Sequence, residues 1–261
     1  MNLLAIVWTV DPDIISSPLT VRWYGLLFAT AFLSGYYLLQ KIFKQEGISE
    51  EWLDKVLMYV MIGTVLGARL GHVFFYDWAY YSQNLSEIPM VWKGGLASHG
   101  AGIGIIFSLW LYSKYVTKKP LLWILDRVAL TVALGAFFIR FGNLMNHEII
   151  GIPTDLPWAF IFTRVDDIPR HPTQIYEALS YLVTFGVLAF MFFKQNWRNL
   201  IGKTFGLFLT LQFLVRFFVE FLKENQSAFE DDLTLNMGQI LSIPFIIIGL
   251  FFIFKPQTSN K

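Results

Sequence analysis

The chain has 261 residues, of which 55% are hydrophobic, 18% aromatic and 15% charged. A soluble domain carries about 25% charged residues, so a water-soluble globule of this composition would expose large apolar patches. The same apolar content excludes intrinsic disorder, and a net charge of +1 argues against a nucleic-acid-binding protein driven by bulk electrostatics. A polytopic membrane protein is the class that remains.

The absence of cysteine limits the chemistry of the chain. It excludes a disulfide and a thiolate metal site, and the four histidines lack the HExxH spacing of a zinc enzyme. If the reaction involves a thiol, that thiol belongs to the substrate.

Seven segments are apolar enough and long enough to span a bilayer, which takes about 20 residues. They are residues 21–39, 53–75, 96–115, 121–139, 175–193, 204–222 and 237–254. We predict an all-α integral membrane protein with about seven transmembrane helices, forming a single membrane domain over residues 1–261. Residues 1–20 become polar after Trp8, so we expect a short interfacial segment there.

The connections on one side of the predicted bundle are rich in lysine and arginine. That side holds Lys41, Lys44, Lys55, Lys114, Lys118, Lys119, Lys194, Arg198, Lys203, Lys255 and Lys261. The other side holds only Lys93, Arg164, Arg170 and Lys223. By the positive-inside rule the first side is cytoplasmic. The N-terminus is then extracytoplasmic, the C-terminus is cytoplasmic, and residues 141–174 form a small external head.

Four arginines, Arg22, Arg69, Arg140 and Arg216, lie within apolar stretches or at their ends. A charge at the bilayer centre costs at least about 2.5–3.5 kcal/mol on insertion scales, so such residues normally face a protein interior or a wet cavity. Snorkelling of the side chain to the headgroups is the alternative, foremost for Arg22.

Residues 94–102, with the sequence GGLASHGAG, open the third span and contain His99 as their only ionisable group. Small residues let two backbones, or a backbone and a ligand, approach closely. A neutral imidazole accepts a proton near pH 7, so His99 is a candidate general base. The alternative is a histidine that hydrogen-bonds between packed helices.

Residues 140–151, with the sequence RFGNLMNHEIIG, combine a guanidinium, two carboxamides, an imidazole and a carboxylate. On a helix Arg140, Asn143 and His147 share a face, whereas Gly142 and Gly151 would break or end the helix instead. Arginine binds phosphate in a bidentate manner and asparagine can support it. The alternative is a capped helix end with a surface Arg–Glu pair.

Two further segments combine arginine and glutamate. Residues 170–177, RHPTQIYE, precede the fifth span, where Pro172 fixes how the chain enters the helix and Glu177 complements the helix dipole. In the sixth span Arg216 and Glu220 are four residues apart and can pair within the bundle. Each segment also has a purely structural interpretation, as a helix N-terminus and as an internal ion pair.

Together these segments resemble the prolipoprotein diacylglyceryl transferase family. The family signature RxGNxxNxExxG occurs at residues 140–151. Five further blocks follow the order of the family: VRWYG at 21–25, GARLG at 67–71, GLASHG at 95–100, RHPTQIYE at 170–177 and RFFVE at 216–220. The chain departs from the family at Gln212, where many members have a tyrosine.

The resemblance implies a transferase that moves the diacylglyceryl group of phosphatidylglycerol to the lipobox cysteine thiol of a prolipoprotein. The products are a thioether-linked lipid and glycerol-1-phosphate. The implied location is the bacterial cytoplasmic (inner) membrane, which the protein crosses several times. The implied partners are phosphatidylglycerol, prolipoprotein signal peptides and membrane lipids, with no nucleic acid.

The same resemblance implies neither a metal nor an organic cofactor, and it assigns roles to residues. His99 is the expected base, and Arg140 and Arg216 are expected to hold the phosphate. The expected substrate-binding residues are Tyr24, Arg140, Asn143, Asn146, Glu148, Gly151, Arg216 and Glu220, with Glu148 orienting an arginine. In an alternative mechanism the arginines alone promote thiol ionisation and His99 only positions the substrate.

Two other classes of protein fit part of the pattern. A lipid or small-solute transporter also lines its path with arginine, glutamate and asparagine, although it would more readily show paired repeats, which the sequence lacks. A membrane scaffold has no need of four intramembrane arginines.

The absence of native cysteine makes the predicted orientation directly testable. An impermeant thiol reagent should label Asp13→Cys and Asp155→Cys from outside the cytoplasmic membrane, because both sites lie on the lysine-poor side. Lys118→Cys should react only after permeabilisation. External labelling of Lys118→Cys would overturn the orientation.

Overall fold

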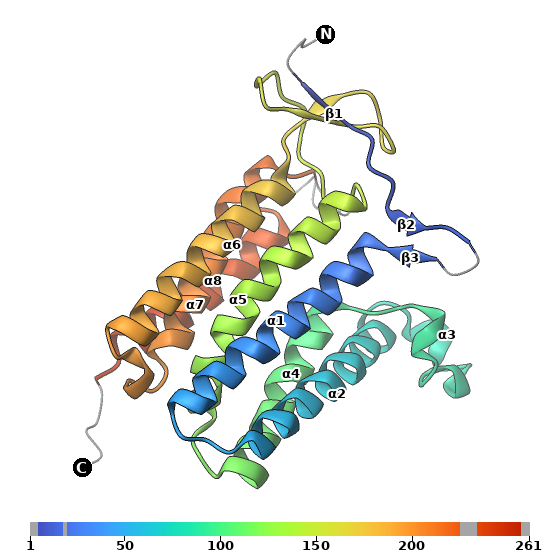
Figure 1. Ribbon diagram of the computed structural model, residues 1–261. Coiled ribbons are helices and arrows are strands. Elements are labelled where there is room, and N and C mark those ends of the chain that lie inside the picture. The colour runs from blue at the N-terminus through green and yellow to red at the C-terminus, as the bar shows by residue number, and fades with distance from the viewer. Residues whose placement is uncertain (1–4, 18–19, 225–233, 257–261) are drawn as a thin grey trace. The chain divides into compact units, whose positions relative to one another are not determined.

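The structure is a computed structural model and describes residues 5–17, 20–224 and 234–256 (Figure 1). The chain divides into two compact units, one of residues 1–38 with 126–261 and one of residues 39–125. We call them the α5–α8 unit and the α2–α4 unit. The boundaries between them fall within the helices α1 and α5. The expectation of one membrane domain over the whole chain stays a prediction.

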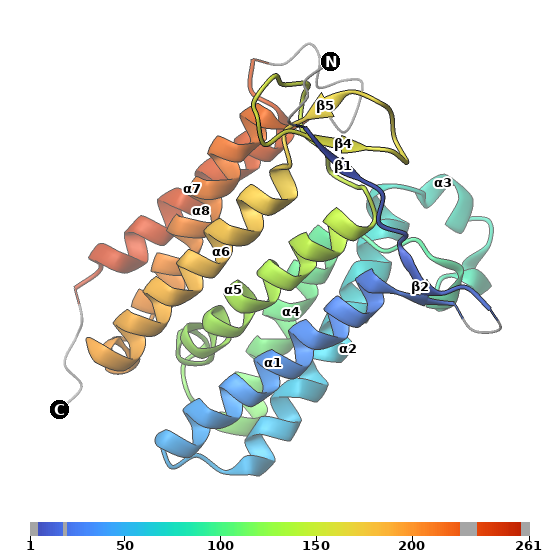
Figure 2. The ribbon, with the colours of Figure 1, turned by 45° about the horizontal axis from the view of Figure 1, so that its top comes forward.

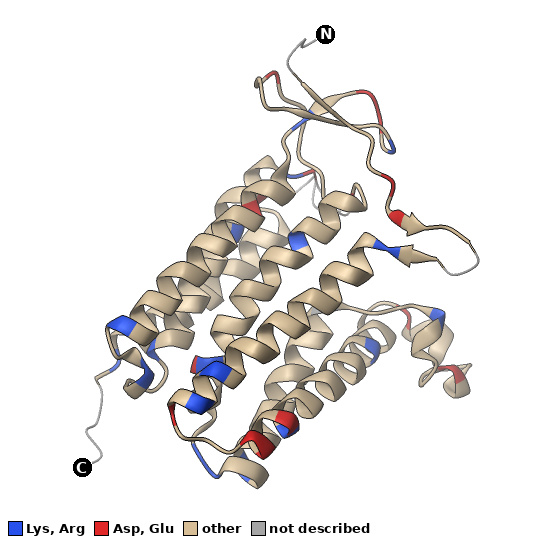
Figure 3. Ribbon diagram, in the orientation of Figure 1, with Lys and Arg blue, Asp and Glu red and all other residues tan. Residues whose placement is uncertain are grey.

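Six helices of the described residues are long and apolar enough to cross a membrane. They are α1 (Trp23–Gln45), α2 (Glu50–Phe75), α5 (Leu121–Met145), α6 (Thr173–Ala189) extended by η4 (Phe190–Lys194), α7 (Lys203–Val219) extended by η6 (Glu220–Leu222), and α8 (Met237–Phe254). Figure 3 shows that charged residues are sparse along these helices. The prediction of a mainly helical, polytopic membrane protein is confirmed, whereas its orientation stays a prediction.

The α-helical part of the third predicted span is shorter in the structure than that of the other spans. Residues 98–117 form α4 (Ser98–Tyr112), of 15 residues, and a π-helical turn, η3 (Ser113–Thr117). Between α2 and α4 the chain forms the short helices α3 (Trp78–Tyr81), η1 (Leu85–Glu87) and η2 (Val91–Lys93). A further short helix, η5 (Trp197–Asn199), precedes α7.

Two small sheets were not predicted from the sequence. β1 (Ile6–Trp8) pairs in parallel with β4 (Phe160–Phe162), which pairs antiparallel with β5 (Pro169–Arg170) (Figure 2). β2 (Asp13–Ile15) and β3 (Val21–Arg22) form an antiparallel pair. The described part of the expected interfacial segment thus contains the two strands β1 and β2. Strands of two or three residues are too short to produce a hydrophobic period in the sequence.

A small apolar core lies under the three-stranded sheet. It contains Leu144, Ile150, Phe160 and Phe162, and Trp8 packs against it. The indole nitrogen of Trp8 donates to the carbonyl of Leu144 at 3.1 Å. The N-terminal strand is therefore held to the end of α5, where the signature segment lies.

Asp126 in α5 fixes the beginning of α7. Its side chain is buried, and its carboxylate accepts hydrogen bonds from the backbone nitrogens of Gly202 at 2.6 Å and Phe205 at 2.8 Å. A carboxylate at a helix N-terminus satisfies unpaired N–H groups and complements the helix dipole. This contact sets the position of α7, which carries Arg216, against α5, which carries Arg140.

In the α2–α4 unit the two longest helices meet through glycines. A Cβ atom placed on Gly67 of α2 would lie 2.8 Å from the Cα of Gly104 in α4. One placed on Gly71 would lie 2.7 Å from the Cα of Gly100. Small residues at a helix crossing let the backbones touch, which is how helices commonly associate in membranes.

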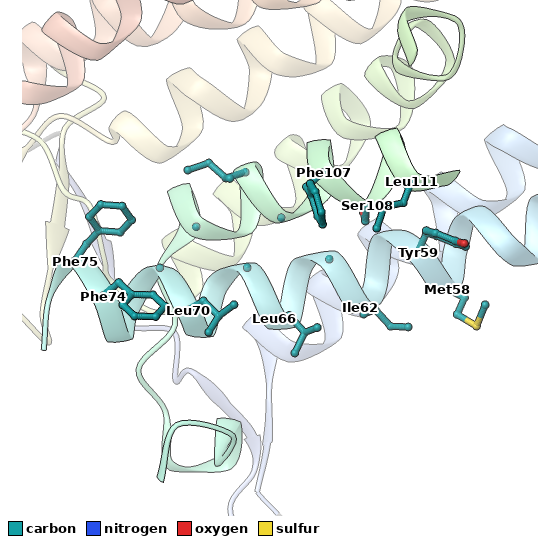
Figure 4. A pocket seen from close by; sticks show the side chains of 16 residues that line it. Met58, Tyr59, Ile62, Leu66, Leu70, Phe74, Phe75, Phe107, Ser108 and Leu111 are labelled. Atoms are coloured by element: carbon teal, nitrogen blue, oxygen red, sulfur yellow. The ribbon is translucent and has the colours of Figure 1, made fainter. Parts of the chain in front are cut away.

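A groove of about 620 Å³ follows this glycine contact (Figure 4). The side chains of Leu66, Leu70 and Phe107 stand beside it. The only hydroxyl groups among its lining side chains belong to Tyr59 and Ser108. The contact of bare backbones thus creates an apolar surface groove between two apolar helices.

Two glycines of α4 provide a matched test of this packing. A Cβ on Gly104 would lie 2.8 Å from Gly67, whereas a Cβ on Gly102 meets nothing within 4 Å. We expect Gly104→Ala to destabilise the protein by about 1–3 kcal/mol through overpacking. Gly102→Ala should be neutral or stabilise it by up to about 1 kcal/mol. Thermal unfolding in detergent measures both, and equal midpoints would contradict the packing described.

Candidate active site

The signature segment begins on the last turns of α5. Arg140 Nε lies 2.8 Å from Glu177 Oε2, and Arg140 Nη1 donates to Asn143 Oδ1 at 3.2 Å. The predicted shared face of Arg140 and Asn143 is confirmed, and α5 continues through Gly142 without a break. His147 does not join them, because it lies beyond the end of α5 at a φ of 56° and its Nε2 contacts a backbone carbonyl.

Glu148 connects the two carboxamides of the signature. Asn143 Nδ2 donates to Glu148 Oε2 at 3.2 Å, and Asn146 Nδ2 donates to Glu148 Oε1 at 3.0 Å. Glu148 was expected to orient an arginine, and among the described residues it has no hydrogen bond or ion pair with one. Its carboxylate instead orients Asn143, and Asn143 in turn holds Arg140.

The loop that carries Glu148 is held by backbone contacts to other elements. Gln174 Nε2 donates to the carbonyl of Glu148 at 2.5 Å, and the backbone nitrogen of Gly151 donates to His171 O at 3.1 Å. A Cβ atom on Gly151 would lie 2.6 Å from His171 O and 2.7 Å from Leu222 O. Gly151 is therefore needed for close backbone packing, and its role in substrate binding stays a prediction.

A buried ion network lies behind Arg140. Glu177 in α6 has no exposed surface, and its Oε1 accepts from Lys223 Nζ at 3.0 Å and from Tyr181 at 3.1 Å. Lys223 Nζ also lies 3.0 Å from Glu220 Oε2. Sequence reasoning assigned Glu177 to a helix dipole and Lys223 to an external connection. The sequence did contain one signal for this network, because a carboxylate within an apolar span requires a cation as its partner.

The predicted Arg216–Glu220 pair does not form, since Glu220 contacts Lys223 instead. Arg216 Nε is buried and has no hydrogen-bond partner among the described residues, and the same is true of Gln212 Oε1, one helical turn earlier. A buried polar group without a partner costs free energy. These two atoms therefore indicate where a polar ligand would be stabilised.

Tyr24, at the start of α1, packs against the signature segment. A Cβ on Gly142 would lie 2.8 Å from Tyr24 Cδ2. The tyrosine ring therefore lies beside the turn of α5 that carries Arg140 and Asn143. Its role in substrate binding stays a prediction.

The segment before α6 organises the external loop. Arg170 is buried, its Nη2 lies 2.6 Å from Asp166 Oδ2, and it also contacts Glu224. The hydrogen bonds from Arg170 lower the pKa of the Asp166 carboxyl. Burial lowers the pKa of His171, whose Nδ1 lies 3.3 Å from the hydroxyl of Tyr176. The contacts of Arg170 with Asp166 and Glu224 therefore give it a structural role.

His99 belongs to the α2–α4 unit and is the second residue of α4. Its exposed ring packs against Phe75 and Tyr76, with ring centroids 5.9 and 5.4 Å apart. No hydrogen bond joins it to another described residue, so the alternative of an interhelical hydrogen bond is not found. Its role as a base stays a prediction.

Arg22 differs from the other three arginines of the apolar stretches. It is largely exposed, lies 3.0 Å from Asp13 and precedes the first residue of α1.

Within the described residues no group of three metal-ligating side chains comes together.

The chain matches the family model of prolipoprotein diacylglyceryl transferase over residues 12–255. It is 48% identical to the phosphatidylglycerol–prolipoprotein diacylglyceryl transferase of Chloroherpeton thalassium over 251 residues, covering 96% of this chain and 94% of that protein. It is likewise 48% identical to the protein of that name from Tolumonas auensis, covering 93% and 94%. The enzyme of Porphyromonas gingivalis is 44% identical, covering 96% and 94%. The chain therefore belongs to the prolipoprotein diacylglyceryl transferase family.

Proposed function

We propose that the chain transfers the diacylglyceryl group of phosphatidylglycerol to the lipobox cysteine of a prolipoprotein signal peptide. The observation that supports the site is Arg216 of α7, whose buried Nε has no hydrogen-bond partner among the described residues. Arg216 lies four residues before Glu220 of the ion network. A phosphodiester is the anion that phosphatidylglycerol would supply there. The protein itself has no thiol, so the nucleophile arrives with the substrate.

The reaction is a substitution at carbon. The cysteine sulfur attacks the glyceryl carbon bonded to the phosphate oxygen, a C–S bond forms and the C–O bond breaks. Its electron pair stays on the oxygen of glycerol-1-phosphate, and the thiol proton passes to a base. The phosphate gains negative charge as the bond breaks, so fixed cations lower the barrier.

Arg140 and Arg216 are the proposed phosphate ligands. Glu177 and Asn143 hold the Arg140 guanidinium at 2.8 and 3.2 Å, which orients it before the lipid binds. Orientation in advance avoids the cost of reorganisation during the reaction. Asn146 and Glu220 support this arrangement, through Glu148 and Lys223 respectively.

His99 is the proposed base. Thiolate, not thiol, is the nucleophile, and a neutral imidazole is a suitable proton acceptor near pH 7. We place the reaction at the outer face of the bacterial cytoplasmic membrane, where the lysine-poor connections are expected. Membrane lipids and signal peptides are the proposed partners, and nucleic acid is not one.

The activity is tested with purified protein, phosphatidylglycerol vesicles and a lipobox peptide. The peptide mass should increase by one diacylglyceryl unit. A peptide with serine in place of the lipobox cysteine should remain unchanged. Failure to modify the cysteine peptide would reject the proposed reaction and favour a transporter.

Arg140→Lys tests phosphate recognition. Lysine keeps the charge but loses the planar donor fork, so one charge-assisted contact worth roughly 1.5–3 kcal/mol is lost, about 10- to 150-fold in rate. Arg164→Lys is the matched control, since among the described residues the one ion pair of Arg164 is its exposed contact with Asp11. Turnover of Arg140→Lys near that of the control would reduce Arg140 to a structural charge.

His99→Gln tests the base. The variant should fold and bind lipid but lose about 10²–10⁴ in rate. Above about pH 9 the substrate thiol ionises without help, so much of the rate should return. Arg140→Lys, in which thiol ionisation is not the defect, should not recover in the same way. A folded His99→Gln enzyme that is equally inactive at every pH would point to a positioning role.

A further inference from the structure

Arg69 has no part in the chemistry proposed so far, although it is a charged residue in an apolar helix and only 2% exposed. It lies on α2. A buried guanidinium is costly unless its N–H groups have acceptors. The acceptors of Arg69 therefore indicate what this residue does.

All hydrogen-bond acceptors of Arg69 are backbone carbonyls of the connection between α2 and α4. Nε donates to Ile88 O, Nη1 to Gly94 O and Nη2 to Glu87 O, each at 2.7 Å. Nη1 also lies 3.4 Å from Gly95 O. Four of the five N–H groups of the guanidinium thus have acceptors, which leaves too few for a bidentate phosphate contact.

The contact is not an ion pair. The nearest acidic residue of the connection, Glu87, directs its carboxylate to Lys93 at 2.9 Å and to the hydroxyl of Tyr80 at 3.1 Å. The ring of Tyr81 lies 4.8 Å from the guanidinium carbon and adds a cation–π contact. Arg69 therefore fixes the path of the backbone rather than neutralising a charge.

Two of the carbonyls that Arg69 binds, those of Gly94 and Gly95, lie a few residues before His99. Gly94 and Gly95 have φ values of 85° and 69° and form the turn before α4. A Cβ on Gly95 would lie 2.9 Å from Arg69 Nη1, so the turn is packed against the guanidinium. Two residues later, the backbone nitrogen of Ala97 donates to Ala68 O at 2.9 Å. α4 begins at the next residue, Ser98, and His99 is its second residue.

We propose that Arg69 is a positioning residue that holds the first turn of α4, and with it the imidazole of His99, in place for proton transfer. The inference rests on the proposed role of His99. The His99 ring has no hydrogen bond of its own to a described residue, so its position depends on its backbone and on its ring contacts with Phe75 and Tyr76. Arg69 supplies the backbone part of that constraint.

A double-mutant cycle tests the proposal in full-length protein with phosphatidylglycerol vesicles and the lipobox peptide. Arg69→Gln alone should lower kcat by about 10- to 100-fold, because a misplaced catalytic group costs this much. The KM for each substrate should stay within about twofold, since ground-state binding is unaffected. In the His99→Gln background, Arg69→Gln should cost less than about threefold, because the group through which it acts is gone.

The dependence of the rate on pH supplies a second readout, which a general structural defect would not change. Arg69→Gln should regain rate above about pH 9, as His99→Gln does, because both variants are impaired in removing the thiol proton. Arg69→Lys should behave like Arg69→Gln, since one ammonium cannot span three separate carbonyls. Lys93→Gln removes an exposed cation of the same connection and should leave kcat unchanged.

Each other outcome overturns the proposal in a distinguishable way. Multiplicative losses in the double mutant, or failure of both Arg69 variants to fold, would make Arg69 a residue of stability alone. Full activity of His99→Gln would reject the base, and the positioning role with it, while leaving the transferase reaction intact. Absence of transfer by the unaltered protein would reject the proposed function itself.

Discussion

The arrangement of the candidate active site depends on one buried carboxylate. Glu177 has no exposed surface, and in an apolar helix such a charge is tolerated only when cations surround it. Arg140 of α5 and Lys223, just after α7, supply them at 2.8 and 3.0 Å. Three elements are thereby fixed around a single side chain of α6, and the guanidinium of the signature acquires a defined direction.

The formal charges of this network cancel, since Arg140 and Lys223 face Glu177 and Glu220. Arg216 lies on the helix that carries Glu220 but takes no part in the pairing. Since Lys223 satisfies Glu220, the guanidinium of Arg216 keeps a buried donor that has no acceptor in the part of the chain that the structure describes. Among the described residues Arg216 is therefore a cation beside the network that pairs with no carboxylate.

The α2–α4 unit is stabilised by a different kind of contact. Its two longest helices touch through Gly67, Gly71, Gly100 and Gly104, where a side chain has no room. Its buried cation, Arg69, is satisfied by carbonyl dipoles instead of carboxylates. Helix packing and backbone hydrogen bonds together define where α4 begins, and hence where its histidine stands.

The sequence by itself determined what depends on neighbouring residues: apolar spans, the shared helical face of Arg140 and Asn143, and the family signature. It did not predict the partners of Glu177, because Lys223 is 46 residues away and no local pattern connects them. It suggested an Arg216–Glu220 pair from helical spacing, and a competing cation three residues beyond Glu220 prevented it. Charge pairing in a low-dielectric interior is decided by which groups the fold brings within about 4 Å, so only the tertiary structure settled these contacts.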